Sequence, residues 1–477
     1  MTSRLVLTVL AAVAIVAAPG QARAPDQRDT GSAAPLTLTI VKRQLSNGLQ
    51  VRIVEQHELP VVQMSLLVPI GTDADPPGRY GIAGLTSAML AEGAGARSAT
   101  AIADALDGLL ANLSASCGVD SCSVQLYVPV GQLAEALPIL ADVSLRPTFP
   151  KQELERVRQQ RLGALRNARD DPDSIAALAF ARGIYGPSDR RAAPPSGTAD
   201  SLKALTAADL ESFHQAVYRP VSSTLIVVGD VESDQVIGLL ETHFGTWQAA
   251  RARGIDKAAP PLQRPPRQLT LIDLPGAPQS RILIGGMSGS SSMSDLFPIQ
   301  VLNTILRSRF ASGRNATLRD YTSGVRLGFE MRKSASPFVV AAAAQSDKTA
   351  DSVRELLGEL TGMLKGVSAD ELARAKDDIA AQFPRTFQAT GRISARLKAV
   401  ESLVVYGLPD DYYSTYMSAI RAVGPGDVQR VAEQYLQPGQ LAIVVVGNRN
   451  TIAPRLRLLD IGTVNEVSVD ELFAPGR

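Results

Sequence analysis

The feature that most constrains this 477-residue chain is an internal repeat with a fixed spacing. The segment Gln152–Arg158 (QELERVR) resembles Asp370–Lys376 (DELARAK), 218 positions further on. Three more pairs keep the same spacing: Asp209 with Asp427, Pro220 with Pro438, and Gly229 with Gly447. Because four pairs share one register, we infer a duplicated unit of about 200 residues. A chain of this length also exceeds one compact core and suits two domains.

The repeat sets the predicted domain organisation. We expect an N-terminal domain at residues 38–247 and a C-terminal domain at 268–465. Residues 248–267 carry two Pro-Pro pairs with little apolar periodicity, which is typical of a stiff linker.

Local patterns predict both strands and helices in the first copy. β-Branched runs predict strands at residues 49–54, 61–69 and 123–128, and apolar periodicity predicts helices at 83–91, 99–110 and 153–167. The elements alternate irregularly and include hairpin-like pairs. We therefore expect an α+β fold, in which each homologous domain packs helices on a mainly antiparallel sheet.

The N-terminus has the layout of a secretory signal peptide at residues 1–24. Arg4 precedes an apolar run, Leu5–Ala18, and the small-residue site Ala22–Ala24 follows. The run of 14 residues is shorter than the roughly 20 that a spanning helix needs. No cysteine lies near the cleavage site. We therefore expect a soluble periplasmic protein with no stable membrane anchor.

Net charge and cysteine content argue against two classes of protein, those that bind nucleic acid and those that hold zinc with cysteines. A formal net charge of +1 gives no indication of a nucleic-acid partner. The two cysteines, Cys117 and Cys122, lie between strand-like runs, so opposed hairpin positions would allow a disulfide in an oxidising compartment. Two inert thiols are the alternative. No histidine lies nearby, which argues against a zinc site at this pair.

A set of short motifs carries a family resemblance. They are Leu45–Leu49 (LSNGL), Gly81–Leu90 (GIAGLTSAML), Arg146-Pro147, Asp170–Pro172, Tyr185-Gly186, Gly197-Thr198, Arg219-Pro220 and Val228–Asp230. In this order and spacing they resemble the pitrilysin/insulinase family of zinc peptidases, in its mitochondrial-processing-peptidase-like branch, over residues 38–465. The resemblance implies two homologous domains in one half-shell, and two half-shells that close around an extended peptide.

The resemblance also implies where the chemistry of active members would lie. Those members hold zinc with two histidines of an H-x-x-E-H helix, whose glutamate activates water. The matching positions here are Gly84, Ser87 and Ala88, none of which is a metal ligand or a base. A third ligand, a glutamate on a later helix, falls on Gln160 or Arg161. We therefore predict no catalytic residue, no metal and no cofactor in this chain, with zinc in a partner subunit.

The histidines do not replace the lost motif. His57, His214 and His243 are the only three in the sequence, and none has a second histidine at a ligand spacing. No G-x-S-x-G nucleophile motif is present either.

One substrate-binding residue is predicted from the resemblance. In heterodimeric members, the subunit without zinc supplies an arginine, and a tyrosine seven residues later, to the substrate. Arg319 matches the arginine, but Arg326 stands where the tyrosine would be. The guanidinium N–H groups of Arg319 would donate hydrogen bonds to a carboxylate or carbonyl oxygen of the substrate. A surface ion pair on a helix is the alternative.

These observations leave three functional hypotheses. The first is a catalytically inactive substrate-binding or regulatory subunit of a periplasmic zinc metallopeptidase complex, partnered by a homologue with an intact H-x-x-E-H motif. The second is a stand-alone peptide-binding or chaperone-like homodimer. The third is an autonomous hydrolase that uses other residues. Co-purification with a zinc-bearing homologue separates the first from the others, and a peptidase assay on the pure chain tests the third.

Overall fold

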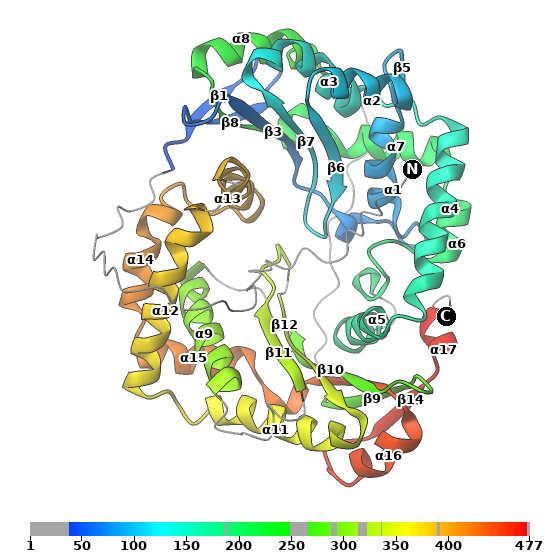
Figure 1. The fold of residues 1–477 in the computed structure, drawn as a ribbon, viewed down its shortest axis with the longest axis vertical. Coiled ribbons are helices and arrows are strands. Elements are labelled where there is room, and N and C mark those ends of the chain that lie inside the picture. The colour runs from blue at the N-terminus through cyan, green and yellow to red at the C-terminus, as the bar shows by residue number, and fades with distance from the viewer. Residues whose placement is uncertain are drawn as a thin grey trace, which may run out of the picture.

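The structure is a computed structural model that describes residues 38–186, 189–248, 266–287, 293–312, 322–334, 336–388 and 392–474. Within these ranges the chain forms two six-stranded sheets and one short two-stranded sheet, with helices packed on the two large sheets (Figure 1). We call residues 38–248 the first half and 266–474 the second half. The predicted signal peptide lies outside the described residues, as does most of the predicted linker.

Five of the six strands in each large sheet follow the same order, read from opposite ends, and the sixth strand pairs antiparallel in the first sheet and parallel in the second. The first half contributes β1 (Val41–Gln44), β2 (Gln50–Glu55), β3 (Val61–Val68), β6 (Asn112–Cys117), β7 (Cys122–Pro129) and β8 (Thr224–Gly229), in the order β1-β2-β8-β3-β7-β6. The second contributes β9 (Gln268–Asp273), β10 (Gln279–Met287), β11 (Thr322–Phe329), β12 (Pro337–Gln345), β13 (Ala442–Gly447) and β14 (Val464–Val467), in the order β11-β12-β10-β13-β9-β14. Most neighbours are antiparallel. The exceptions are β2 with β8, and β9 with β13 and with β14.

The duplication predicted from the sequence is confirmed by equivalent elements. Glu153 lies in helix α4 (Lys151–Ala168) and Glu371 in α12 (Ala369–Gln388). Asp209 and Asp427 lie in the first turns of α7 (Ala207–Val217) and α15 (Pro425–Tyr435). The α+β fold with two sheet-and-helix domains is likewise confirmed.

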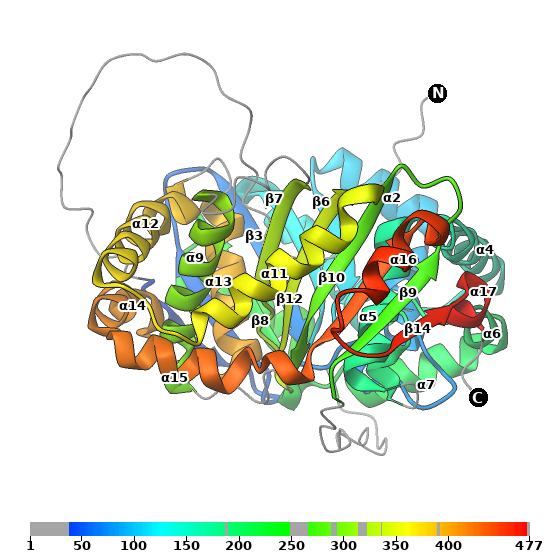
Figure 2. The same cartoon turned by 90° about the horizontal axis from the view of Figure 1, so that it is seen from below.

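The remaining helices surround the sheets. In the first half they are α1 (Ile82–Met89), α2 (Ala99–Gly108), α3 (Leu133–Leu145), α5 (Pro172–Tyr185), α6 (Ala199–Ala204) and α8 (Ser233–Phe244). In the second half they are α9 (Leu296–Ser312), α11 (Thr349–Met363), α13 (Arg392–Tyr406), α14 (Tyr412–Ala422), α16 (Arg449–Arg457) and α17 (Val469–Phe473). Figure 2 shows α11 and α16 crossing the outer face of the second sheet.

Each half has its own apolar core. In the first, strand residues such as Met64 and Leu66 pack against helix residues such as Leu85 of α1 and Leu137 of α3. In the second, α9, α11 and α15 cover the equivalent face. Burial of these side chains is the main favourable contribution to folding, at roughly 25 cal/mol per Å² of apolar surface.

The opposite face of each sheet is covered by a helix from the other half. Helix α5, from the first half, packs on β10 and β13 of the second sheet, and its apolar residues join those strands in one cluster. Helix α13, from the second half, packs on β3 and β8 of the first sheet. Figure 1 shows both helices lying between the two sheets. The two halves are therefore joined by a reciprocal exchange of helices.

A polar contact also links the halves near the centre of the molecule. Lys333, in the connection between β11 and β12, reaches the β6–β7 turn of the first half. Its backbone N–H donates to Asp120 Oδ1 (3.1 Å), and its Nζ donates to the carbonyl oxygens of Asp120 (3.2 Å) and Pro69 (2.5 Å). The same turn is closed by Cys117 and Cys122, which face each other in the β6–β7 register and are joined through their sulfur atoms.

Candidate functional site

Helix α1 carries the three positions that the family resemblance aligns with the zinc motif, and a buried aspartate fixes its start. Asp75 Oδ2 accepts the Gly81 N–H (2.6 Å), and Oδ1 accepts the Ala83 N–H (3.1 Å). Two of the N–H groups that a helix leaves without partners at its start are thereby satisfied. Burial raises the pKa of Asp75 to about 7, against the lowering effect of these hydrogen bonds. Sequence analysis missed this residue, although the Asp-Pro-Pro-Gly turn ahead of α1 marks the place.

The loop before α6 holds the beginning of α1 by close backbone packing. A Cβ on Gly81 would lie 2.7 Å from the Gly197 Cα, and one on Gly197 would lie 2.4 Å from the Tyr80 carbonyl oxygen. Both glycines have φ near +90°, a conformation that disfavours other residues. Ser201 Oγ donates to the same Tyr80 oxygen at 2.6 Å. The close approach and the positive φ therefore explain why glycine occurs in the two sequence motifs around residues 81 and 197.

The three lost positions lie on α1 with small side chains. Gly84 and Ala88 are partly exposed, whereas Ser87 is buried. The Ser87 hydroxyl has no hydrogen-bond partner among the described residues. The backbone scaffold of the motif is therefore formed, but its ligand and base atoms are missing.

Of the two residues that the family resemblance aligns with the acidic ligand, the one in contact with α1 is a cation. Arg161 on α4 faces α1, and its Nη2 donates to the Gly84 carbonyl oxygen at 2.7 Å. Gln160, the other residue that the alignment allowed, is exposed. A Cβ on residue 84 would lie 3.2 Å from Arg161 Nη1, so glycine leaves room for the guanidinium. Burial lowers the pKa of Arg161, and the Asp75 charge partly opposes this effect.

These residues do not fit a zinc ion. Zinc in proteins takes cysteine sulfur, histidine nitrogen or carboxylate oxygen, and Gly84, Ser87 and Ala88 supply none of them. The guanidinium of Arg161 would also repel a dication placed beside Gly84. Across the described ranges, no group of three histidine, cysteine or acidic side chains could hold a metal. No step of zinc chemistry is therefore assigned to this chain.

The edge of the first sheet runs beside the altered helix. Strand β6 is the last strand of that sheet and contacts α1. Asn112, Ser114 and Ser116 are exposed along it, in alternation with partly buried residues. Among the described strands, β6 pairs only with β7, so its outer edge offers backbone N–H and C=O groups to another chain.

The β6–β7 turn ties this edge strand to the segment that leads into α1. The backbone N–H of Thr72 donates to Gly118 O (2.9 Å), and that of Asp73 donates to Val119 O (3.1 Å). A Cβ on Gly71 would lie 2.3 Å from both carbonyl oxygens, so this approach requires glycine. The edge strand, the disulfide-bonded turn and α1 consequently form one connected unit.

The other predicted residues lie elsewhere. Arg319 falls outside the described residues. His57 Nδ1 lies 2.7 Å from Asp230 Oδ1, a contact that raises the pKa of this exposed histidine. His214 is buried, and its Nε2 lies 2.9 Å from the Ser144 carbonyl oxygen.

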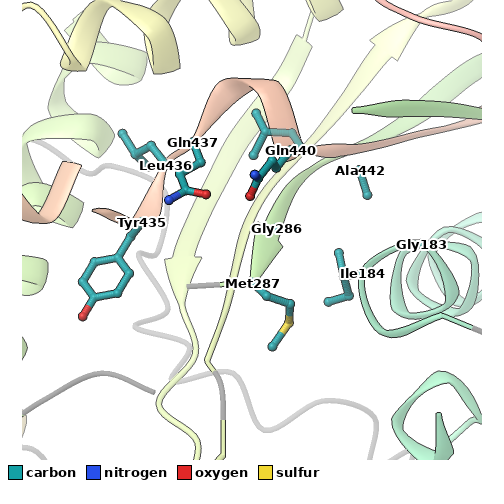
Figure 3. Close-up of a pocket in the computed structure, with 10 residues that line it drawn as sticks. Gly183, Ile184, Gly286, Met287, Tyr435, Leu436, Gln437, Gln440 and Ala442 are labelled. Atoms are coloured by element: carbon teal, nitrogen blue, oxygen red, sulfur yellow. The ribbon is translucent and has the colours of Figure 1, made fainter. Parts of the chain in front are cut away.

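A small pocket lies where α5 meets the second sheet (Figure 3). Gly183 and Ile184 of α5 line it together with Gly286 and Met287 of β10 and with residues 435–437 and 440–442. Its volume of about 20 Å³ is enough for a water molecule but not for a peptide or cofactor. The pocket is therefore a small gap in the contact between the two halves, and we assign it no binding role.

Comparison with known families identifies the chain. The profile described as "Insulinase (Peptidase family M16)" matches residues 50–181, and that of the "Peptidase M16 inactive domain" matches residues 204–379. The chain belongs to the insulinase, or M16, peptidase family.

Two relatives illustrate the range of names in this family. The "Uncharacterized zinc protease ML0855" of Mycobacterium leprae is 28% identical over 56% of this chain and 60% of its own length. The chain thus spans less than two thirds of that relative. The "Non-peptidase homolog YmxG" of Helicobacter pylori is 21% identical over 83% of this chain and 91% of its own.

Solved structures of similar proteins share the fold. A peptidase M16 inactive domain from Pseudomonas fluorescens has a TM-score of 0.77 and 22% identity, covering 86% of this chain and 98% of its own. The first half of the periplasmic protease PqqL from Escherichia coli has a TM-score of 0.72 and 18% identity, covering 88% and 95%. Against whole PqqL the match covers 52% of that chain.

No helix in the part of the chain that the structure describes is both long and apolar enough to cross a membrane.

Proposed function

We propose that this chain is a catalytically inactive, peptide-binding subunit of a zinc metallopeptidase complex. One observation carries the proposal. The scaffold of the zinc motif is intact, with α1 held by Asp75 and Gly197 beside the open edge of β6, while Arg161 lies against Gly84 where relatives place metal ligands. A site that keeps its geometry and loses its ligands retains the means to bind substrate without cleaving it.

Peptide binding is proposed at the β6 edge. An extended peptide that pairs with an exposed edge strand gains backbone hydrogen bonds without requiring a particular sequence. The exposed Ser114 and Ser116 leave the edge free of bulky side chains. Such binding would place the peptide next to α1, which contacts the same strand.

A partner of the same fold is proposed because the chain matches one half of a larger assembly. It corresponds to 95% of the first half of PqqL but to 52% of the whole protein. The partner would be a homologous catalytic subunit with an intact H-x-x-E-H motif and bound zinc. The signal-like residues 1–24, together with the periplasmic location printed for PqqL, support a periplasmic complex.

The decisive experiment mixes this chain with such a homologue and measures complex formation and peptide hydrolysis. We expect a stable complex and a higher kcat/KM than the homologue shows alone, because closure adds binding surface and positions the peptide. If no complex forms and the rate is unchanged, the subunit role is wrong. A self-associated chain that still binds peptide would favour the stand-alone binding protein. Hydrolysis by the pure chain would favour an autonomous hydrolase.

Arg319 provides a finer test within that complex. If its side chain contacts substrate, Arg319→Ala should lower kcat/KM roughly tenfold to a hundredfold, the loss of about 1–3 kcal/mol expected for a charge-assisted contact. An unchanged kcat/KM would remove Arg319 from the substrate site and leave the subunit role in place.

A further inference from the structure

We propose that Arg161 makes the altered metal position a binding site for a carboxylate of the peptide. The inference rests on the proposed function, because the ligand is the peptide that we place along β6. It adds a chemical preference for that peptide, which the proposed function alone does not specify.

The first argument is the unused hydrogen-bonding capacity of Arg161. A guanidinium has five N–H donors in a rigid, planar arrangement. Within the described residues, Arg161 makes one hydrogen bond, to the Gly84 carbonyl oxygen, and no carboxylate lies within ion-pair distance. The donors that the protein does not use belong to a partly exposed side chain, so they can bind a carboxylate from outside the chain.

The second argument concerns the nearest acid. Asp75 is the charge that influences Arg161, but both Asp75 oxygens already accept backbone N–H groups at the start of α1. Its pKa of about 7 also leaves the carboxyl partly protonated near neutral pH. Asp75 is therefore committed to the helix, and Arg161 keeps the capacity to bind an external carboxylate.

The third argument is access and shape. Arg161, Gly84 and Ala88 are all partly exposed, and the two α1 residues have little or no side chain. The helix that carries Gly84 contacts β6, so a peptide paired with that edge passes close to α1. Arginine binds carboxylates through two parallel N–H···O bonds, which gives strength and orientation. The carboxylate would come from an acidic side chain or from the C-terminus of the peptide.

The test uses three fluorescein-labelled peptides of one unstructured sequence. The first has a glutamine at the central position and an amidated C-terminus. The second replaces that glutamine with glutamate, and the third keeps glutamine but has a free C-terminal carboxylate. Fluorescence anisotropy would give Kd for each peptide with the wild-type chain, with Arg161→Gln and with Arg166→Gln. Arg166 is a matched control, because it lies exposed on the same helix.

We expect at least one carboxylate peptide to bind the wild-type chain about tenfold more tightly than the neutral peptide. The preference should disappear in Arg161→Gln and persist in Arg166→Gln. The peptide that shows the preference identifies the carboxylate source. Arg161→Lys keeps the charge without the planar donors, so part of the preference should remain. Thermal unfolding of each variant would show whether it is folded.

Two results would overturn the inference, and they differ in their meaning. If the wild-type chain binds all three peptides equally, or if the preference survives in Arg161→Gln, then Arg161 only holds α1 against α4, and the proposed peptide-binding function stands. If the wild-type chain binds none of the peptides, both the carboxylate site and the proposed peptide binding are wrong.

Discussion

The two exchanged helices occupy equivalent places but make different contacts. Helix α5 meets the second sheet with apolar residues such as Ile175 and Phe180, packed against Val444 and Val446. Helix α13 meets the first sheet partly through polar groups. There, Glu401 Oε1 accepts hydrogen bonds from Ser65 Oγ (2.6 Å) and Gln125 Nε2 (3.0 Å).

The difference shows how a duplicated fold diverges. Apolar packing is non-directional, so the α5 contact depends mainly on shape and buried area, with one exposed ion pair between Asp173 of α5 and Arg281 of β10. Buried polar groups require matched partners, so the α13 contact also depends on protonation. Another position diverges in the same way: His214 of α7 corresponds to Ala432 of α15, at the spacing of the repeat. The two copies therefore carry titratable groups at different places. Glu401 of α13 stands where α5 has Gly183, and His214 of α7 stands where α15 has Ala432.

Phe180→Ala should have the largest effect, because it removes a side chain from the apolar contact. Phe180 is 5% exposed, and its ring lies over Gly285 of β10. Urea unfolding should show a loss of about 3–5 kcal/mol, as for other buried aromatic truncations. Leu458→Ala is the control, since Leu458 is 82% exposed and its loss should cost below about 0.5 kcal/mol. Similar small losses for both variants would show that α5 contributes little to the second sheet.

His214→Gln should remove an acid sensitivity that belongs to the first half. Burial lowers the pKa of His214 from 6.5 to about 4 in the folded protein. The unfolded chain therefore takes up the proton first, so this stability is present above pH 6.5 and is lost as the pH falls through about 4. Relative to the variant, the wild-type protein should lose about 3 kcal/mol over that range. Unfolding curves measured at several pH values would check this, and parallel pH profiles would contradict it.

The disulfide of the β6–β7 turn should contribute less to the free energy of unfolding than burial of neutral His214 does. Replacing Cys117 and Cys122 with serine should lower the free energy of unfolding by about 2 kcal/mol, because closing so short a loop removes little entropy from the unfolded chain. Under native, non-reducing conditions neither thiol should react with an alkylating agent. Alkylation of both would show that the protein carries no such bond, and the two-thiol alternative would hold.

Glu401→Gln should have the smallest effect and an opposite pH dependence to His214→Gln. Burial raises the pKa of Glu401, so its contribution is most favourable at or below the ordinary value of 4.5 and declines as the pH rises through the folded pKa. Glutamine keeps the oxygen that accepts both hydrogen bonds. The variant should differ by below about 1 kcal/mol at pH 5 and be the more stable protein at pH 8. A greater loss at pH 8 than at pH 5 would be inconsistent with a buried, weakly acidic group.

Much of the fold could be predicted from the sequence, because the repeat preserves the register of whole elements. The helix expected at 153–167 is α4 (Lys151–Ala168), and the strand expected at 61–69 is β3 (Val61–Val68). The helix exchange could not be predicted. Apolar periodicity predicts that one side of α5 is buried. It does not indicate whether a residue such as Ile175 packs on the sheet of its own half or on the sheet of the other half.

The sequence predicts which residues occupy the motif positions of the candidate site, but not the contact between Arg161 and Gly84. Gly84, Ser87 and Ala88 follow from the motif spacing. Gln160 and Arg161 differ by about 100° around the helix axis, so only the packing of α4 on α1 decides which one faces Gly84. The link from Lys333 to Asp120 joins residues 213 positions apart, and no local pattern indicates it.

The helix exchange also determines when the protein can finish folding. The first sheet needs α13 to cover Val54 and Ile226, and α13 is made only after residue 391 has been added. Until then, a nearly complete N-terminal half presents an apolar sheet face to water. The first sheet is therefore covered on both faces only when the second half is present, and the two halves become native together.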